Sequence, residues 1–223
     1  MVNRVVNPAF DLQPGFHHIY EIELINKYVK GESILDIGCW SGQFLSLIQQ
    51  ASKITGLDPN KNAIAFAKQH RKGTYIVGSA LSLPFENNSF DVVTMWDVIE
   101  HLPKRTEQKA IQEATRALKK NGIFALSTPT NNPISIITDL AYFLIEHRHY
   151  SEKYLVNLLF ANGLKIIKIE YGGGIWTLIK SNIDLLIKHI FGKKLKLSFL
   201  DKLVKNEYKG NGFSEIHIIA QKK

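Results

Sequence analysis

Two aspartates stand at the ends of short apolar runs, and a helix-forming stretch follows each run. Asp36 lies in the run Ser33–Ile37, and Asp58 follows the run Lys53–Leu57, which places it 58 − 36 = 22 residues later. In nucleotide-binding folds, a carboxylate at the end of the second strand accepts hydrogen bonds from the ribose hydroxyls of an adenosine cofactor. We therefore expect Asp58 to bind a ribose. Capping of the following helix is the competing role for this residue taken alone.

A turn of mostly small residues joins the first apolar run to the stretch behind it. Gly38 and Gly42 lie in this turn, with Cys39 and Trp40 between them. Glycine permits positive φ and a close approach of the backbone to a ligand, and a helix N-terminus offers unpaired N–H groups. A dinucleotide site needs the pattern G-x-G-x-x-G, but Trp40 and Gln43 stand where its second and third glycines belong. The turn therefore disfavours NAD and favours S-adenosylmethionine, which has no phosphate to approach the backbone.

Apolar runs alternate with helical patterns along the first part of the chain, with helices expected near residues 42–51, 61–71 and 105–119. Most of the runs are apolar throughout, as in parallel strands that are covered on both faces. This alternation indicates right-handed βαβ crossovers. Five strands are expected here, at Ser33–Ile37, Lys53–Leu57, Thr74–Gly78, Phe90–Met95 and Gly122–Ser127.

The flanking segments complete the expected α/β fold, a Rossmann-like doubly wound sheet of seven strands. The sheet is mostly parallel with its last strand antiparallel, and helices cover both faces. We expect a single domain over 1–223, with an N-terminal helical cap over 1–30, a cofactor-binding half over 31–128 and an acceptor-side half over 129–223. The further expected elements are a helix at Phe16–Val29, a lid at 129–150, a helix at 151–161, a strand at Leu164–Tyr171, an amphipathic helix at 175–191 and a strand at Phe213–Ala220.

Positive charge gathers in the C-terminal part of the chain. The net charge of +8 divides into 18 − 16 = +2 over residues 1–175 and 10 − 4 = +6 over residues 176–223. A basic patch favours an anionic substrate, a membrane surface or a nucleic acid, and a solvated basic face is the alternative. The single cysteine excludes an internal disulfide, and with no secretory signal or membrane span in the sequence we expect a cytoplasmic protein. The patch is formed by Lys188, Lys193, Lys194 and Lys196.

Four segments follow one another along the chain: Leu35–Gly42, Gly56–Pro59, Gly78–Phe85 and Ser89–Leu102. In this order and spacing they resemble consecutive motifs of the class I S-adenosylmethionine-dependent methyltransferases. The resemblance is to the type 11/type 23 group, which includes ubiquinone-pathway and glycan or lipid methyltransferases. It covers about residues 30–130 strongly, and it continues more weakly through His147 and residues 150–169.

The resemblance implies S-adenosyl-L-methionine as the cofactor and S-adenosyl-L-homocysteine as the product. Asp36 would orient the methionine amino group, Asp58 would hold the ribose, and Ser79 would lie at the adenine edge. The family usually has glycine in place of Trp40 and aspartate in place of Ser79. Trp40 could crowd the cofactor, lie near its sulfonium or fill space beside the N-terminal helix. The implied cofactor-binding set is Asp36, Gly38, Cys39, Trp40, Gly42, Asp58, Pro59, Ser79, Ala80, Leu81 and Trp96.

Methyl transfer from a sulfonium is an in-line displacement, so alignment and exclusion of water are the main requirements. A base is needed only for a neutral hydroxyl or a protonated amine. His101 is the candidate base, with a surface or capping role as its alternative, and His147 and His149 in the lid are further candidates. Asp97 and Glu100 could share a helix face with His101, at i, i+3 and i+4. Some ubiquinone-pathway relatives use a divalent metal at a similar cluster, but with one histidine here we expect no metal.

The expected activity is transfer of a methyl group to a small-molecule, lipid-linked or glycan acceptor. A degenerate cofactor-binding member without catalysis is one alternative, motivated by Trp40 and Ser79. An RNA methyltransferase is another, motivated by the basic C-terminal part; no DNA partner is expected. The apolar stripe of the helix at 175–191, flanked by Lys180 and Lys188, fits core packing, a homodimer contact or a peripheral membrane contact. The chain is expected to be a monomer or a homodimer.

Overall fold

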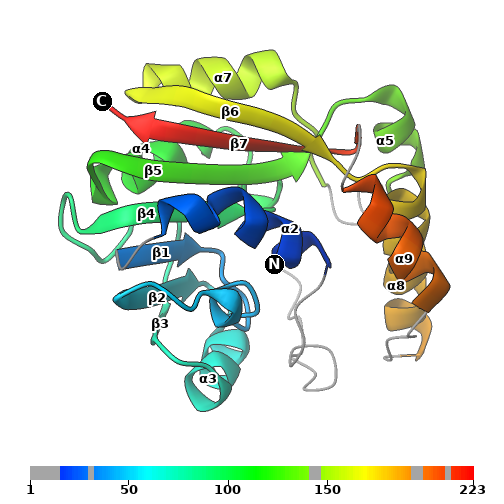
Figure 1. Ribbon diagram of the computed structural model, residues 1–223, viewed down its shortest axis with the longest axis horizontal. Coiled ribbons are helices and arrows are strands. Elements are labelled where there is room, and N and C mark those ends of the chain that lie inside the picture. The colour runs from blue at the N-terminus through cyan, green and yellow to red at the C-terminus, as the bar shows by residue number, and fades with distance from the viewer. Residues whose placement is uncertain (1–15, 30–32, 141–146, 192–197, 209–211) are drawn as a thin grey trace.

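The computed structural model describes residues 16–29, 33–140, 147–191, 198–208 and 212–223 (Figure 1). Within this part of the chain, one sheet has the order β3-β2-β1-β4-β5-β7-β6. β7 is antiparallel to both of its neighbours and all other pairs are parallel, which confirms the expected fold class. The strands are β1 (Ser33–Ile37), β2 (Lys53–Asp58), β3 (Thr74–Val77), β4 (Phe90–Trp96), β5 (Leu118–Pro129), β6 (Leu164–Gly172) and β7 (Glu215–Lys222).

Helices cover both faces of the sheet. One face carries α2 and α3, whose buried side chains pack with those of Ile34 and Val92, and Figure 1 shows α2 in front of the sheet. The other face carries α4 and α7, which pack on Leu35 and Val93. All five residues of β1 are buried, as its uniformly apolar sequence predicts. The helices are α2 (Phe16–Ile25), α3 (Lys61–His70), α4 (Glu107–Ala117), α5 (Pro133–Thr138), α7 (Glu152–Ala161), α8 (Ile175–Phe191) and α9 (Ser198–Glu207).

Three short 3-10 turns complete the described elements: η1 (Asn26–Tyr28), η2 (Leu45–Leu47) and η3 (Ile99–His101). The helix expected at 42–51 is wrong, because η2 is all that forms there before the chain extends at Ile48. The helix expected at 105–119 ends at Ala117, and β5 begins at the next residue. The helical patterns did not predict α5 or α9. The remaining strands and helices agree with the expectations to within a few residues.

Parallel strands bring their carboxyl ends to one edge of the sheet, and α5, α8 and α9 gather at that edge (Figure 1). β7 runs the opposite way, so its first residues lie at the same edge as the last residues of β5. No helix in the ranges given above is long and apolar enough to cross a membrane. Lys193, Lys194, Lys196 and the side chain of Lys188 lie outside the described residues, and the cytoplasmic location stays a prediction.

Candidate functional site

Asp36 is buried on the face of the sheet that carries α2 and α3. Its register partner on β4 is Thr94, whose hydroxyl donates to Asp36 Oδ1 at 2.7 Å. Burial raises the pKa of Asp36 well above its usual value, and the hydrogen bond from Thr94 opposes this rise. The nearby carboxylates of Glu21 and Asp58 raise it further. A cationic group beside Asp36 would therefore be stabilised strongly.

The turn after β1 folds back onto β2. The backbone N–H groups of Gly38 and Cys39 both donate to the carbonyl oxygen of Leu57, at 2.7 and 3.1 Å. Gly38 has φ +80° and Gly42 has φ +75°, a region that favours glycine. Cys39 is buried, and burial raises the pKa of its thiol. The thiol is therefore a packing group, and the backbone of this turn is the part that faces the carboxyl edge.

Replacing Gly38 by alanine is expected to destabilise the fold by about 2–4 kcal/mol, because strain at positive φ adds to steric overlap. A Cβ at Gly38 would lie 2.3 Å from Val98 Cγ2. Gly163 is the matched control, since it has φ +77° and a Cβ there would meet nothing within 4 Å. In urea unfolding, Gly163→Ala should lower the free energy of unfolding by about 1 kcal/mol. Equal losses of unfolding free energy in Gly38→Ala and Gly163→Ala would contradict the role of the contact with Val98. The double variant Gly38→Ala/Val98→Ala should recover part of the loss seen in Gly38→Ala.

Asp58 ends β2 and accepts two backbone hydrogen bonds. The Trp40 N–H donates to its Oδ2 at 3.0 Å, and the Asn60 N–H donates to its Oδ1 at 2.8 Å. The N-cap of α3 is Asn60, whose side chain accepts from Asn62 and Ala63, so the capping role considered for Asp58 is wrong. Burial raises the pKa of Asp58, and the two backbone hydrogen bonds oppose that rise.

Trp40 has φ +47°, a conformation that costs a non-glycine residue roughly 1–3 kcal/mol. Its backbone N–H helps to orient the Asp58 carboxylate, and its side chain is partly buried. The conformation explains why glycine is usual at this position of the family. The three roles considered for the Trp40 ring stay predictions.

The residues expected at the adenine edge lie just after β3. Ser79 is exposed, and its hydroxyl accepts from the N–H of Leu81 at 3.1 Å. The Ala80 side chain is buried, and Pro59, which directly follows the neighbouring strand β2, is exposed. The N–H of Gly78 donates to the Asp58 carbonyl at 3.1 Å, which ties this turn to the carboxylate expected to hold the ribose.

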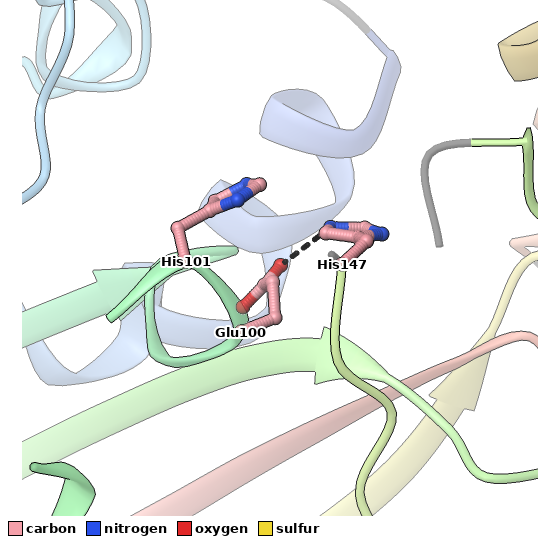
Figure 2. Close-up of side chains that lie close together, drawn as sticks. All are labelled: Glu100, His101 and His147. Atoms are coloured by element: carbon pink, nitrogen blue, oxygen red, sulfur yellow. Dashed lines mark ion pairs between the residues drawn. The ribbon is translucent and has the colours of Figure 1, made fainter. Parts of the chain in front are cut away.

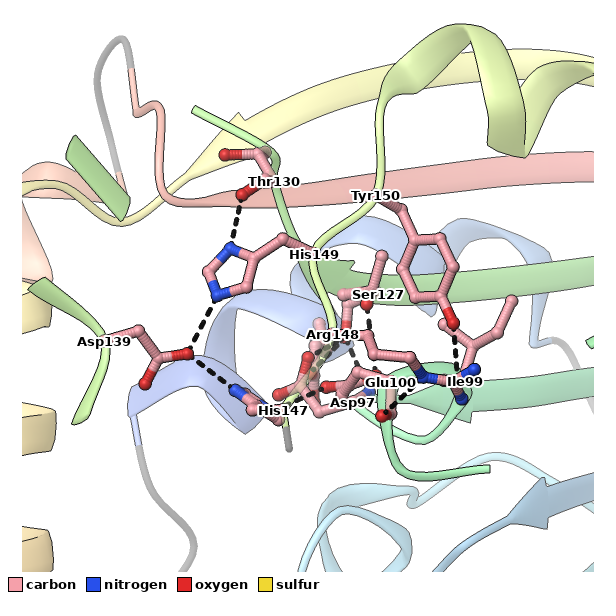
Figure 3. Close-up of polar contacts among 12 residues, drawn as sticks. Asp97, Ile99, Glu100, Ser127, Thr130, Asp139, His147, Arg148, His149 and Tyr150 are labelled. Atoms are coloured by element: carbon pink, nitrogen blue, oxygen red, sulfur yellow. Dashed lines mark hydrogen bonds and ion pairs between the residues drawn. The ribbon is translucent and has the colours of Figure 1, made fainter. Parts of the chain in front are cut away.

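Asp97, just after β4, and Ser127, near the end of β5, form a polar pair. Asp97 has φ +51°, and its N–H donates to Ser127 Oγ at 3.0 Å, while Ser127 Oγ donates to Asp97 Oδ1 at 2.8 Å (Figure 3). Glu21 of α2 is fully buried against Ser127, at 3.5 Å. Burial raises the pKa of Glu21 well above its usual value, and Asp97 raises it further. Trp96 lies beside this pair, packed edge-on against Phe44 at 5.6 Å between ring centroids.

The first residues of β7 add a second buried group to this edge. His217 lies opposite Ser127 in the sheet, and neither of its ring nitrogens has a hydrogen-bond partner within the described ranges. Burial lowers the pKa of His217 to about 4. Burial, together with repulsion from Asp97, raises the pKa of Glu215 to about 8, although the Tyr208 hydroxyl donates to it at 2.6 Å. Neither residue could be predicted as part of the site, because nothing local in the β7 sequence distinguishes them from other strand residues.

Asp97, Glu100 and His101 do not share a helix face, so that expectation is wrong. η3 is a single short turn, and Asp97 precedes it with a left-handed backbone. Glu100 points inward and is 1% exposed, whereas His101 is exposed. The His101 ring stacks on that of His147 at 4.8 Å between centroids (Figure 2). The structure therefore brings His101 to a lid residue, and its role as a base stays a prediction.

His147 and His149 belong to a chain of polar contacts between the lid and the sheet (Figure 3). Asp139 Oδ2 lies 2.8 Å from His147 Nδ1 and 2.9 Å from His149 Nε2. On its other side, His147 Nε2 lies 3.6 Å from Glu100 Oε1. Burial alone would lower the pKa of His147, but hydrogen bonds and charges from Asp139 and Glu100 together raise it to about 10.

Arg148, between these histidines, ties the lid to η3 (Figure 3). Its guanidinium donates to the carbonyl oxygens of Ile99 at 2.9 Å and of Leu102, and its Nε donates to that of Glu100 at 3.2 Å. It also forms an ion pair with the buried carboxylate of Glu107. This one side chain therefore holds η3 in place beneath the lid.

Comparison with known proteins finds similarity to methyltransferases. A family profile described as "Methyltransferase domain" matches residues 35–126. The chain is 28% identical over 220 residues to an uncharacterised protein of Methanocaldococcus jannaschii, a match that covers 93% of this chain and 83% of the relative. It is 31% identical over 123 residues to the demethylmenaquinone methyltransferase of Oceanobacillus iheyensis, where the match covers 51% of this chain and 50% of that relative. The structure of a SAM-dependent methyltransferase from Archaeoglobus fulgidus has the same fold, with a TM-score of 0.67 and 22% identity over 93% of this chain and 95% of that one.

Proposed function

Because the chain belongs to the class I S-adenosylmethionine-dependent methyltransferases of the type 11 group, we propose that it methylates a small-molecule, lipid-linked or glycan acceptor. The observation that carries the proposal is the pair of buried carboxylates, Asp36 and Asp58, at the ends of adjacent parallel strands. Between them lies a turn whose glycine backbone can approach a ligand closely. This arrangement fits a ligand that has a cationic amine at one end and a ribose at the other.

The chain's own residues would hold the cofactor along the carboxyl edge. Asp36 would orient the methionine amino group, and the backbone of Gly38 and Cys39 would line the methionine part. Asp58 already accepts two N–H groups, but a carboxylate has about four acceptor positions and can also take the ribose hydroxyls. The turn at Ser79–Leu81 would border the adenine, with Ser79 as a weaker acceptor than a carboxylate.

The acceptor would enter beside Trp96, on the β5 side of the cofactor. Three carboxyl groups, those of Glu21, Asp97 and Glu215, lie there. Burial, together with their mutual repulsion, raises the pKa values of Glu21 and Glu215. A polyanionic acceptor would add to this repulsion, so an RNA substrate is the weaker alternative. We propose that the reacting atom of the acceptor is neutral, with His101 as the candidate to take up a released proton.

Calorimetric titration with S-adenosylhomocysteine tests this proposal. The unmodified chain should bind one equivalent, and Asp58→Ala should weaken binding at least tenfold, which corresponds to about 1.4 kcal/mol. Asn60→Ala is the control, because it removes the α3 cap and about 1 kcal/mol of stability without touching the expected ribose contact. If the unmodified chain binds nothing up to millimolar ligand, the cofactor assignment is wrong. An affinity unchanged by Asp58→Ala would overturn the ribose role alone.

A further inference from the structure

Three side chains of the lid direct metal-ligand atoms at one point. They are Asp139 after α5, and His147 and His149 ahead of α7 (Figure 3). The carboxylate oxygen and the two imidazole nitrogens all lie within 4.8 Å of one another. The two nitrogens lie 2.8 and 2.9 Å from the same oxygen, Oδ2 of Asp139. Two imidazoles and a carboxylate form a common three-residue ligand set for transition metals.

The far side of each imidazole is also fixed by an acceptor. His149 Nδ1 lies 2.6 Å from the carbonyl oxygen of Thr130, which can only accept, so this nitrogen carries a proton and Nε2 faces Asp139. His147 Nε2 faces the Glu100 carboxylate at 3.6 Å, and Glu100 in turn accepts from the Thr128 hydroxyl at 3.1 Å. Metal-binding histidines almost always have such a carbonyl or carboxylate behind the ring.

We propose that Asp139, His147 and His149 bind one divalent transition-metal ion, with Glu100 and Thr130 orienting the two histidines. Two nitrogen ligands favour Zn²⁺, Co²⁺ or Ni²⁺ over Mg²⁺, which prefers oxygen. Three protein ligands leave at least one coordination position open, at the carboxyl edge of the sheet. The site differs from the set at Asp97, Glu100 and His101 that the sequence suggested. It does not depend on the proposed methyl transfer.

Calorimetric titration of chelator-treated full-length protein with ZnCl₂ tests the site. We expect one ion per chain, little response to MgCl₂ at the same concentrations, and a visible d–d absorption band when Co²⁺ is used as the probe. His149→Gln can still donate to Thr130 but cannot act as the imidazole ligand, so it should weaken Zn²⁺ binding by at least about tenfold and abolish the Co²⁺ band. Far-UV circular dichroism of the metal-free variant checks that the fold is intact.

Two further variants decide where the ion lies. Asp139→Asn should also weaken Zn²⁺ binding, whereas His101→Ala should leave the affinity within about twofold. If His101→Ala weakens Zn²⁺ binding and His149→Gln does not, the ion lies at Glu100, His101 and His147, and the proposal is overturned. The absence of saturable Zn²⁺ binding to the unmodified chain, or equal binding to His149→Gln, would also overturn it.

Discussion

Replacing Arg148 by methionine is expected to lower the free energy of unfolding by about 3–5 kcal/mol, because it leaves a buried charge without its partner. The Glu107 carboxylate is 9% exposed and would lose its ion pair. The carbonyl oxygens of Ile99, Glu100 and Leu102 would each lose a charged donor. The methionine side chain retains most of the volume, so the loss measures polar contacts more than a cavity.

Urea unfolding of the purified variants checks this expectation. Glu107→Leu combined with Arg148→Met should recover part of the loss, because the double variant no longer buries an unpaired carboxylate. Lys109→Met is the matched control, since Lys109 is 57% exposed and lies 3.7 Å from Glu113 on the surface of α4. That substitution should change stability by less than about 0.5 kcal/mol. If Arg148→Met lowers the free energy of unfolding by less than about 1 kcal/mol, the prediction is wrong and water replaces the polar contacts of Arg148 readily.

The stability of the fold is expected to fall by about 2 kcal/mol between pH 6.5 and pH 8 because of Glu215, at 1.36 kcal/mol per pH unit. Its pKa is raised from 4.5 to about 8, so over this range the folded chain holds a proton that the unfolded chain has released. His217 acts in the opposite direction, because its pKa is lowered from 6.5 to about 4 and the unfolded chain holds the extra proton. The contributions of Glu215 and His217 to the pH dependence of stability therefore cancel between about pH 4.5 and 6.5. Above pH 6.5 only the decline from Glu215 remains of the two.

Glu215→Gln should remove the contribution of Glu215 to that decline and make the fold more stable than the unmodified chain at pH 8. His147, whose pKa is raised from 6.5 to about 10, adds a separate decline that should remain. Glutamine can still accept the hydrogen bond from Tyr208, which the carboxylate accepts at 2.6 Å. Urea unfolding at half-unit pH steps gives the slope. Glu23→Gln, the same substitution at an exposed residue of α2, should leave the slope unchanged. If Glu215→Gln leaves the slope unchanged, Glu215 does not contribute to it, and other groups such as Glu21 and His147 produce it.

The cofactor half of the fold could be predicted from the sequence because its determinants are local. Uniformly apolar runs gave the buried strands, and the spacing of Asp36 and Asp58 placed both carboxylates at one edge. The glycine turn was identified correctly, and Gly38 and Gly42 both have positive φ. The helix expected after this turn does not form. Apolar spacing alone does not show where a chain leaves the helical conformation, and this chain becomes extended at Ile48.

The acceptor side could not be predicted, because its residues meet only through tertiary structure. Glu21, Ser127 and Glu215 come from α2, β5 and β7, and no spacing in the sequence relates them. The lid histidines were noted as candidates, but their convergence on Asp139 depends on how the segment after α5 returns to the sheet. The sequence alone therefore does not show that these three side chains meet.

The interior position of β7 has a consequence for synthesis on the ribosome. β5 and β6 are complete by residue 172, yet they are joined only through β7, which begins at Glu215. Until that segment emerges, one edge of β5 and both edges of β6 lack a partner strand, and such edges can pair with other chains. The last strand also contributes Glu215 and His217, so the sheet and the acceptor edge of the site would be completed together, in the last step of folding.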